Sequence, residues 1–121
     1  MAEGILSGPG DGEVLRNEKG NRTVLVKGTF PHVSVFEFTL EGPFDGPDPH
    51  THDGETDSFY VLEGEVDFFL EGEWTRHGPG TFFSAPPGVE HAFAKHDPGT
   101  ARLLNIHAPG GFEHELRDIS V

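Results

Sequence analysis

The stretch HTHDGETDSFYVLEG, residues 50–64, joins two histidines, a carboxylate and a strand-like run that ends in a glycine. In an extended segment, residues i and i+2 point to the same face, so the imidazoles of His50 and His52 can meet one metal ion. Asp57 follows His52 by five positions. A His-x-His pair also occurs on ordinary protein surfaces. The pair alone is therefore weak evidence for a metal site.

A second stretch, GTFFSAPPGVEH at residues 80–91, supplies a third histidine, His91. Its Gly and Pro residues are typical of turns that bound a short apolar strand. The segment GPDP at residues 46–49, directly before His50, contains two prolines. Prolines lack the N–H that a central strand must donate, so this segment suits the rim of a barrel better than the centre of a sheet.

Short strand-like runs recur along the chain and are separated by Gly- and Pro-rich turns. Several runs alternate apolar and polar residues, as half-buried strands do. Only the tail has helical spacing, with Phe112, Leu116 and Ile119 on one face. We expect an all-β jelly roll or closed barrel with a short C-terminal helix. The predicted strands are Asn21–Lys27, Ser34–Leu40, Ser58–Glu63, Glu65–Leu70, Glu73–His77, Thr81–Ala85, His91–Lys95 and Ala101–His107.

Length and composition limit the other possibilities. At 121 residues the chain is one domain. We expect residues 1–13 to form a flexible arm and residues 14–121 a single barrel. The net charge of −13 argues against binding to nucleic acid or to an anionic membrane. With no cysteine, disulfides and thiolate metal sites are excluded. The N-terminus resembles no signal peptide, so a cytoplasmic protein is the simplest expectation.

The two histidine-containing stretches resemble the paired motifs of the cupin family. In the first motif, four residues separate His52 from the acidic position, Asp57, and six more separate it from Gly64. The second motif matches at its Gly, Pro-x-Gly and His positions, and departs only at its last position, where Lys95 replaces Asn. The resemblance implies a double-stranded β-helix, the cupin barrel. It also implies one divalent metal bound by His50, His52, His91 and a carboxylate, and it suggests a homodimer.

The donor set leaves the metal and the carboxylate open. Three imidazoles and a carboxylate suit Fe, Mn, Ni, Co, Cu or Zn. The family usually has Glu at the acidic position, whereas this chain has the shorter Asp57. Asp57 can bind the metal directly or act from outside the ligand set, orienting an imidazole or moving a proton, and Glu55 can take its place. We expect Lys95 to lie at an exposed strand end.

The resemblance is strongest to the small quercetinase-like cupins. It suggests a metal-dependent dioxygenase, an oxidoreductase acting on a small aromatic or enediol substrate, with Asp57 or Glu55 accepting the substrate proton. Two alternatives stay open: a metal-assisted isomerase or lyase, and a module that binds a small molecule without catalysis. His107 is weighed equally as a pocket residue and as a packed or rim histidine. The expected apolar pocket lining is Phe36, Phe38, Phe59, Phe82 and Phe93, with His107.

Overall fold

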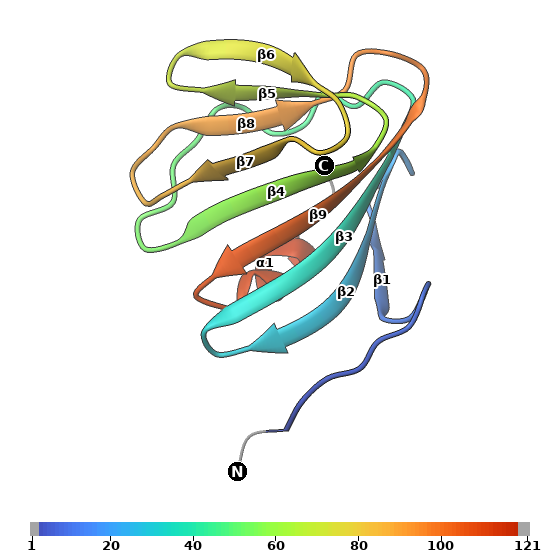
Figure 1. The fold of residues 1–121 in the computed structure, drawn as a ribbon, viewed down its shortest axis with the longest axis vertical. Coiled ribbons are helices and arrows are strands. Elements are labelled where there is room, and N and C mark those ends of the chain that lie inside the picture. Colours follow the sequence, from blue (N-terminus) through green and yellow to red (C-terminus); the bar gives the residue numbers. More distant parts are fainter. Residues whose placement is uncertain (1–2, 119–121) are drawn as a thin grey trace.

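A computed structural model describes residues 3–118 and places them in nine strands and one helix (Figure 1). Eight strands correspond to the predicted runs, with small differences at their ends. The predicted C-terminal helix is also present. The elements are β1 (Glu13–Arg16), β2 (Arg22–Phe30), β3 (Val33–Glu41), β4 (Thr56–Glu63), β5 (Val66–Leu70), β6 (Glu73–His77), β7 (Phe82–Ala85), β8 (His91–Ala94), β9 (Thr100–Ala108) and α1 (Phe112–Asp118).

The strands form two antiparallel sheets that roll into a barrel (Figure 1). The larger sheet has the order β1-β2-β3-β9-β4-β7, and the smaller has the order β6-β5-β8. The loop between β3 and β4 adds to the smaller sheet, because Phe44 and His50 form isolated bridges with Lys95 and His91 at the two ends of β8. The expected all-β jelly-roll barrel with a short C-terminal helix is confirmed.

Phenylalanine rings fill the space between the sheets. Along β3 the buried positions alternate, so that Phe36, Phe38 and Leu40 face inward as expected. Phe68 of β5 is 2% exposed and stacks on Phe83 of β7, with ring centroids 4.5 Å apart. Each buried ring removes a large apolar area from water. Aromatic packing is therefore the main contribution to this small core.

Helix α1 lies against the larger sheet at one end of the barrel (Figure 1). Leu116 is buried, and the Phe112 ring packs edge-on against Phe36 of β3 at 6.2 Å between centroids. The carboxylate of Glu113 accepts a hydrogen bond of 2.8 Å from the Ser34 hydroxyl, which ties the helix to β3. The third predicted apolar position, Ile119, lies outside the described residues.

The sequence did not predict β1. This strand is mostly exposed and pairs only with β2, so it carries little of the alternation that marks a buried strand. Two residues that precede β1 in the sequence, Gly8 and Asp11, accept hydrogen bonds at their carbonyl oxygens from the Lys27 ammonium of β2, at 2.7 and 2.8 Å. These contacts tie part of the N-terminal segment to β2. The flexibility of residues 1–13 stays a prediction.

The expectation that Lys95 is exposed is wrong. Lys95 is 2% exposed, and its ammonium donates to the Glu65 carbonyl oxygen at 3.2 Å and to the Asp97 carboxylate. The backbone of Lys95 pairs with Phe44, so the loop between β3 and β4 crosses the strand end at this point. Lys95, which the sequence suggests is the exposed end of a strand, is therefore buried where this loop adds to the smaller sheet.

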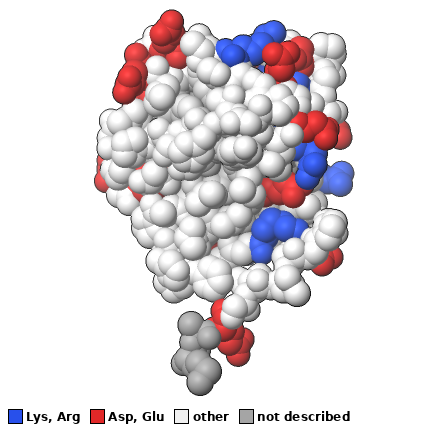
Figure 2. Space-filling view, viewed as in Figure 1, with Lys and Arg blue, Asp and Glu red and all other residues white. Residues whose placement is uncertain are grey.

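Charged groups of both signs share the surface. Figure 2 shows Lys and Arg side chains interspersed with Asp and Glu along one edge of the viewed face. The Arg102 guanidinium, for example, lies 2.6 Å from the Glu37 carboxylate, and the Arg117 guanidinium lies 2.7 Å from Glu13. In residues 3–118 no helix has the length and apolarity needed to cross a membrane.

Replacing Phe68 with Ala is expected to lower the free energy of unfolding by about 3–5 kcal/mol, because it leaves a cavity among stacked rings. The matched control is Phe82→Ala on strand β7, directly before Phe83 in the sequence, where the ring is 62% exposed. That change is expected to cost no more than about 0.5 kcal/mol. Urea denaturation followed by fluorescence measures both. Equal losses would contradict the assignment of the core.

Candidate metal centre

The backbone brings His50 next to His91. The N–H of His50 donates to the His91 carbonyl oxygen at 3.0 Å, and the N–H of His91 donates back to the His50 carbonyl oxygen at 2.9 Å. Gly46 lets the same loop pass close to β8, because a Cβ there would lie 1.9 Å from the Phe93 carbonyl oxygen. Two segments that are distant in the sequence are thus joined at the candidate site.

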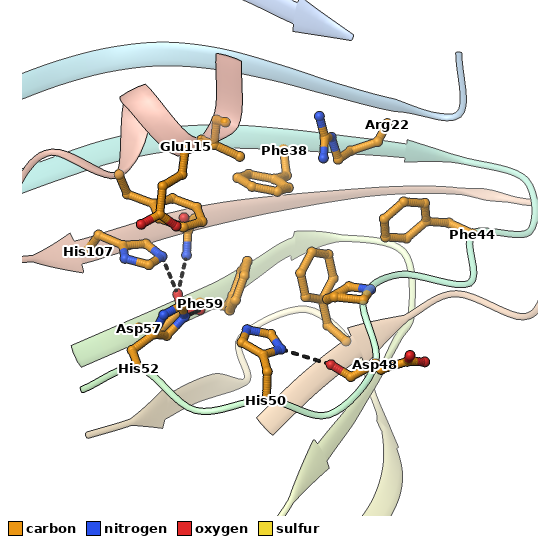
Figure 3. A pocket seen from close by; sticks show the side chains of 15 residues that line it. Arg22, Phe38, Phe44, Asp48, His50, His52, Asp57, Phe59, His107 and Glu115 are labelled. Atoms are coloured by element: carbon orange, nitrogen blue, oxygen red, sulfur yellow. Dashed lines mark hydrogen bonds and ion pairs between the residues drawn. The ribbon is translucent and has the colours of Figure 1, made fainter. Parts of the chain in front are cut away.

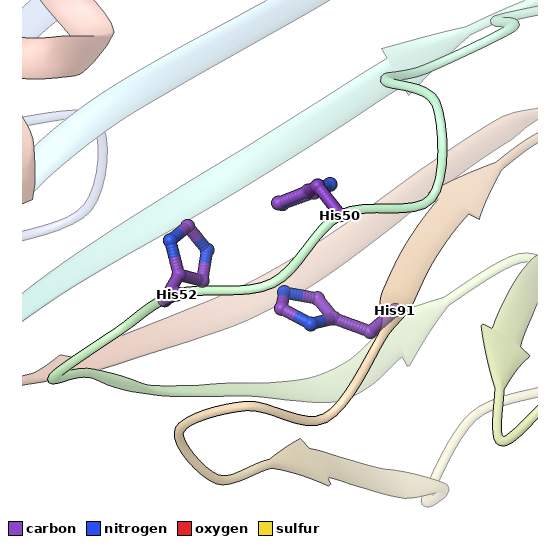
Figure 4. Close-up of side chains that lie close together, drawn as sticks. All are labelled: His50, His52 and His91. Atoms are coloured by element: carbon purple, nitrogen blue, oxygen red, sulfur yellow. The ribbon is translucent and has the colours of Figure 1, made fainter.

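The three predicted histidines form one cluster (Figure 4). The ring centroids of His50 and His91 lie 4.5 Å apart, and the His52 ring lies 5.0 Å from His50 and 5.1 Å from His91. One nitrogen of each ring lies within 4.8 Å of the others, which is a group that could hold a metal ion. The geometry thus agrees with the arrangement that the two motifs predict.

Backbone carbonyl groups orient two of these rings. The Nδ1 atoms of His50 and His91 lie 2.9 Å from the carbonyl oxygens of Asp48 and Val89. A carbonyl only accepts, so each Nδ1 carries the proton and each Nε2 of the neutral ring presents a lone pair. Such a contact to the second nitrogen is typical of metal-binding histidines.

Two further observations fit a cation at this point. His52 Nε2 is buried and has no hydrogen-bond partner among the described residues. His91 Nε2 lies 3.1 Å from the Asp57 carboxylate, and because its Nδ1 already donates to a carbonyl, this contact needs either a second proton on the ring or a cation between the two atoms. A positive ion here would satisfy the carboxylate and both imidazole nitrogens. The nitrogen and oxygen donors suit a divalent transition metal.

Asp57, on β4, lies at the centre of the polar groups. It is 5% exposed, and its Oδ1 lies 3.0 Å from His107 Nε2 and 2.8 Å from the Asn105 amide nitrogen. Its Oδ2 lies 3.1 Å from His91 Nε2 and 3.7 Å from His52 Nε2. Asp57 also forms a second possible metal-binding group with His52 and His107. The carboxylate is therefore placed either to bind an ion or to act beside it.

Glu55 contacts His107 and lies near only one of the three predicted histidines, His52. Its Oε2 lies 3.1 Å from His107 Nδ1 and 3.9 Å from His52 Nδ1, and Glu55 is in neither possible metal-binding group of the described residues. His107 is 1% exposed and stacks flat on Phe112, with centroids 3.8 Å apart. His107 thus links a partly exposed carboxylate, Glu55, to the buried carboxylate of Asp57.

The sequence reasoning missed Asn105. This side chain is fully buried and donates both to Asp57 and to the Ser58 carbonyl oxygen, at 2.8 and 2.9 Å. A usable signal was present, because residues 103, 105 and 107 share the inward face of β9. A polar residue between a buried leucine and His107 on that face indicates a partner inside the barrel.

The protein shifts the pKa of three of these groups. Burial lowers the pKa of His50, whereas the nearby Asp57 carboxylate raises the pKa of His52. Burial alone would raise the pKa of Asp57, but contacts from His107, His52 and His91 outweigh it and hold that pKa well below its ordinary value. Asp57 therefore stays ionised, and its negative charge favours a cation among the histidines.

A pocket of about 270 Å³ opens beside the cluster (Figure 3). Its walls include His50, His52, Asp57 and His107, so the polar groups reach it directly. The other walls are mainly apolar, and their phenylalanines are Phe38, Phe44, Phe59, Phe93 and Phe112. A small flat molecule that enters would lie between aromatic rings with one end at the histidines.

Four of the six residues expected in the pocket line it, namely Phe38, Phe59, Phe93 and His107. The expectation for Phe82 is corrected, because this ring is 62% exposed and pairs with Tyr60 on the outer face of β4 and β7. The expectation for Phe36 is also corrected. Phe36 is fully buried and packs against Phe112 and His107, so it supports the wall without lining it.

The structure resembles known β-barrel proteins along most of its length. An RmlC-like cupin from Shewanella frigidimarina matches with a TM-score of 0.77, at 20% identity over 93% of this chain and 96% of that chain. The nucleoside dehydratase Pac13 of Streptomyces matches with a TM-score of 0.70, at 18% identity over 93% of this chain and 88% of that chain. At these identities, the likeness shows the fold.

Two sequence comparisons agree with this likeness. Quercetin 2,3-dioxygenase of Bacillus subtilis is 30% identical over 70 residues, which are 58% of this chain. The match spans a fifth, 20%, of that relative's length. The family model for the cupin domain matches residues 36–107, which include the three histidines, Asp57 and His107. The chain therefore belongs to the cupin family.

Proposed function

We propose that this cupin is a metal-dependent dioxygenase that acts on a small aromatic or enediol substrate. In this proposal His50, His52 and His91 hold one divalent transition metal, with Asp57 as a fourth ligand or as a base beside it. The observation that carries the proposal is the cluster of three imidazoles and a buried carboxylate beside an aromatic-lined pocket, which His50, His52 and Asp57 line directly. The 30% identity to a quercetin 2,3-dioxygenase over 70 residues supports the reaction class.

The bound ion would supply Lewis-acid and redox chemistry for a substrate that has adjacent oxygen atoms. The chain itself would provide the remaining functions. The rings of Phe38, Phe59 and Phe93 would pack on a flat substrate and exclude water from it. The ionised carboxylate of Asp57 would accept the proton of a substrate hydroxyl group, while Asn105 and His107 hold that carboxylate in position.

A second candidate is a metal-assisted lyase or isomerase. The contact chain from Glu55 through His107 to Asp57 favours it, because the chain leads from a partly exposed group to the pocket and would carry a proton between them. A nucleoside dehydratase shares this fold, which shows that cupin barrels accommodate such chemistry. This candidate predicts turnover without oxygen, which the dioxygenase cannot give. Homodimer assembly and a cytoplasmic location stay predictions.

The metal ligands can be tested by composition. The purified protein is expected to contain about one transition-metal ion per chain, and replacing His50, His52 or His91 with Ala should reduce this to near zero. His114→Ala is the matched control, since that side chain is 76% exposed. Lowering the pH below about 6 should release the ion, because protons compete for the imidazoles. Plasma mass spectrometry measures each case, and unchanged metal in all three variants would refute the site.

The role of Asp57 is tested by Asp57→Asn, which keeps the shape and removes the charge. We expect turnover to fall by about 10²–10⁴-fold, because the base is lost. Retained metal in this variant would place Asp57 outside the ligand set, and lost metal would make it a ligand. Glu55→Gln is the comparison and is expected to keep its metal. Turnover of Asp57→Asn equal to that of the wild type would contradict both roles.

The reaction class is tested with an oxygen electrode. Protein loaded with Fe, Mn, Ni or Co is given flavonols and simpler enediols. We expect oxygen uptake with at least one combination of metal and substrate. The same mixtures are incubated without oxygen and analysed by chromatography. Product that forms equally well with and without oxygen, and with no oxygen uptake, would favour the lyase or isomerase. Binding of a substrate with no turnover in either condition would instead indicate a non-catalytic module.

A further inference from the structure

Asn105 contains a buried hydrogen-bond acceptor that the described chain does not satisfy. The residue is 0% exposed, and its Oδ1 has no hydrogen-bond partner among residues 3–118. Buried polar groups of native proteins are nearly always hydrogen-bonded, because an unsatisfied one costs stability. Asn105 also lines the pocket beside the histidine cluster. An unsatisfied acceptor at this position points to a ligand that brings a donor.

The contacts of the amide nitrogen fix the orientation of this side chain. Nδ2 lies 2.8 Å from Asp57 Oδ1 and 2.9 Å from the Ser58 carbonyl oxygen, and an ionised carboxylate and a carbonyl can only accept. With the amide reversed, three oxygen atoms would face one another. Both N–H groups are therefore used toward β4, and Oδ1 is the polar atom of the amide that remains for the pocket.

The strand pairing places Asn105 beside the surface on which an aromatic ring would lie. Asn105 of β9 is directly opposite Phe59 of β4, and Phe59 lines the pocket. Cβ atoms of directly opposite residues are about 5 Å apart, so a ring packed on Phe59 can carry a substituent to the amide. Because the same amide contacts Asp57, this position also adjoins the candidate metal centre.

The other polar walls of the pocket favour a ligand with donors. Asp48 and Glu115 contribute carboxylates, which accept hydrogen bonds and repel anions. Figure 3 shows the Glu115 carboxylate on the same side of the pocket as His107. Arg22 is the one Lys or Arg residue among the lining residues described, and it already has an interaction within the chain. A neutral ligand that donates hydrogen bonds suits these walls better than an anion.

We propose that Asn105 determines specificity, because its Oδ1 accepts a hydrogen bond from a hydroxyl or amino group of the substrate. The ligand class is a neutral aromatic molecule with one oxygen directed to the histidines and a second polar group that donates to Asn105. Such a site rejects an analogue that lacks the donor, since binding would leave the buried oxygen unsatisfied. This inference deepens the proposed function, on which its catalytic meaning rests. The contact itself needs neither dioxygen nor turnover.

The experiment compares ligands that differ in one donor. Catechol and resorcinol are titrated into the full chain against 2-fluorophenol and 3-fluorophenol, in which a fluorine of similar size replaces one hydroxyl group and cannot donate. Resorcinol cannot chelate a metal, because its hydroxyl groups are too far apart. Each diphenol is expected to bind about tenfold more tightly than its fluoro analogue, as measured by chemical-shift changes in NMR spectra.

Asn105→Thr is the test variant, since its hydroxyl group can still donate to Asp57 while the amide oxygen is gone. It should bring the two affinities of each pair within about twofold of each other. Asn21→Thr is the matched control, because Asn21 lies outside this pocket, and it should leave the preference unchanged. A preference retained in Asn105→Thr, or lost equally in Asn21→Thr, would overturn the proposal.

A second measurement needs only the wild type. The chain has three asparagines and no glutamine, so its side-chain amide signals come from Asn17, Asn21 and Asn105. The Asn105 signal should shift more with each diphenol than with its fluoro analogue, whereas the Asn21 signal should not distinguish them. Equal affinities within both pairs, no binding of any of the four ligands, or no such difference at Asn105 would overturn the proposal even if Asn105→Thr does not fold.

The two proposals can fail separately. The titrations are made without dioxygen, on protein as purified and again with added Zn²⁺, which is diamagnetic. A donor preference that depends on Asn105, found together with no oxygen uptake in the electrode, would leave the Asn105 contact standing and remove the dioxygenase. Oxygen uptake, found together with no donor preference, would do the reverse.

Discussion

The pair of backbone hydrogen bonds between His50 and His91 is the constraint on which the site depends. It joins the loop between β3 and β4 to the first residue of β8, and so places two imidazoles 4.5 Å apart between centroids. At the other end of β8, Phe44 and Lys95 form a second antiparallel bridge of the same kind. The loop is thereby held as an additional, irregular strand. Without this joint, the three histidines would have no common position.

The second constraint is the burial of Asp57. An ionised carboxylate inside an apolar barrel is costly unless donors or a cation surround it. Here Asn105 and His107 face one oxygen, and His91 faces the other. His107 in turn is held by its stack on Phe112. The C-terminal helix therefore acts on the chemistry through packing, because it positions the imidazole that positions the carboxylate.

Much of this molecule could be read from local patterns. Alternation and Gly/Pro turns are properties of a few consecutive residues, and they located eight of the nine described strands. The spacing of His50 and His52 predicted that their imidazoles share one face, because extended backbone has a fixed geometry. The resemblance to the paired cupin motifs added His91 and a carboxylate to this pair, and it left open whether Asp57 or Glu55 faces the histidines.

Other features depend on which strands become neighbours, and these only the tertiary structure decided. Alternation places Phe82 and Phe83 on opposite faces of their strand, but it does not say which of the two faces inward. The pairing of β7 with β4 sets that choice. The crossing of Phe44 turned Lys95 from an apparent strand end into a buried position. Likewise, the contact of Glu55 with His107 joins residues from separate segments. By itself the sequence determined the strands and the donor atoms; long-range pairing decided what those atoms face, because contacts across strands leave no periodic trace in the chain.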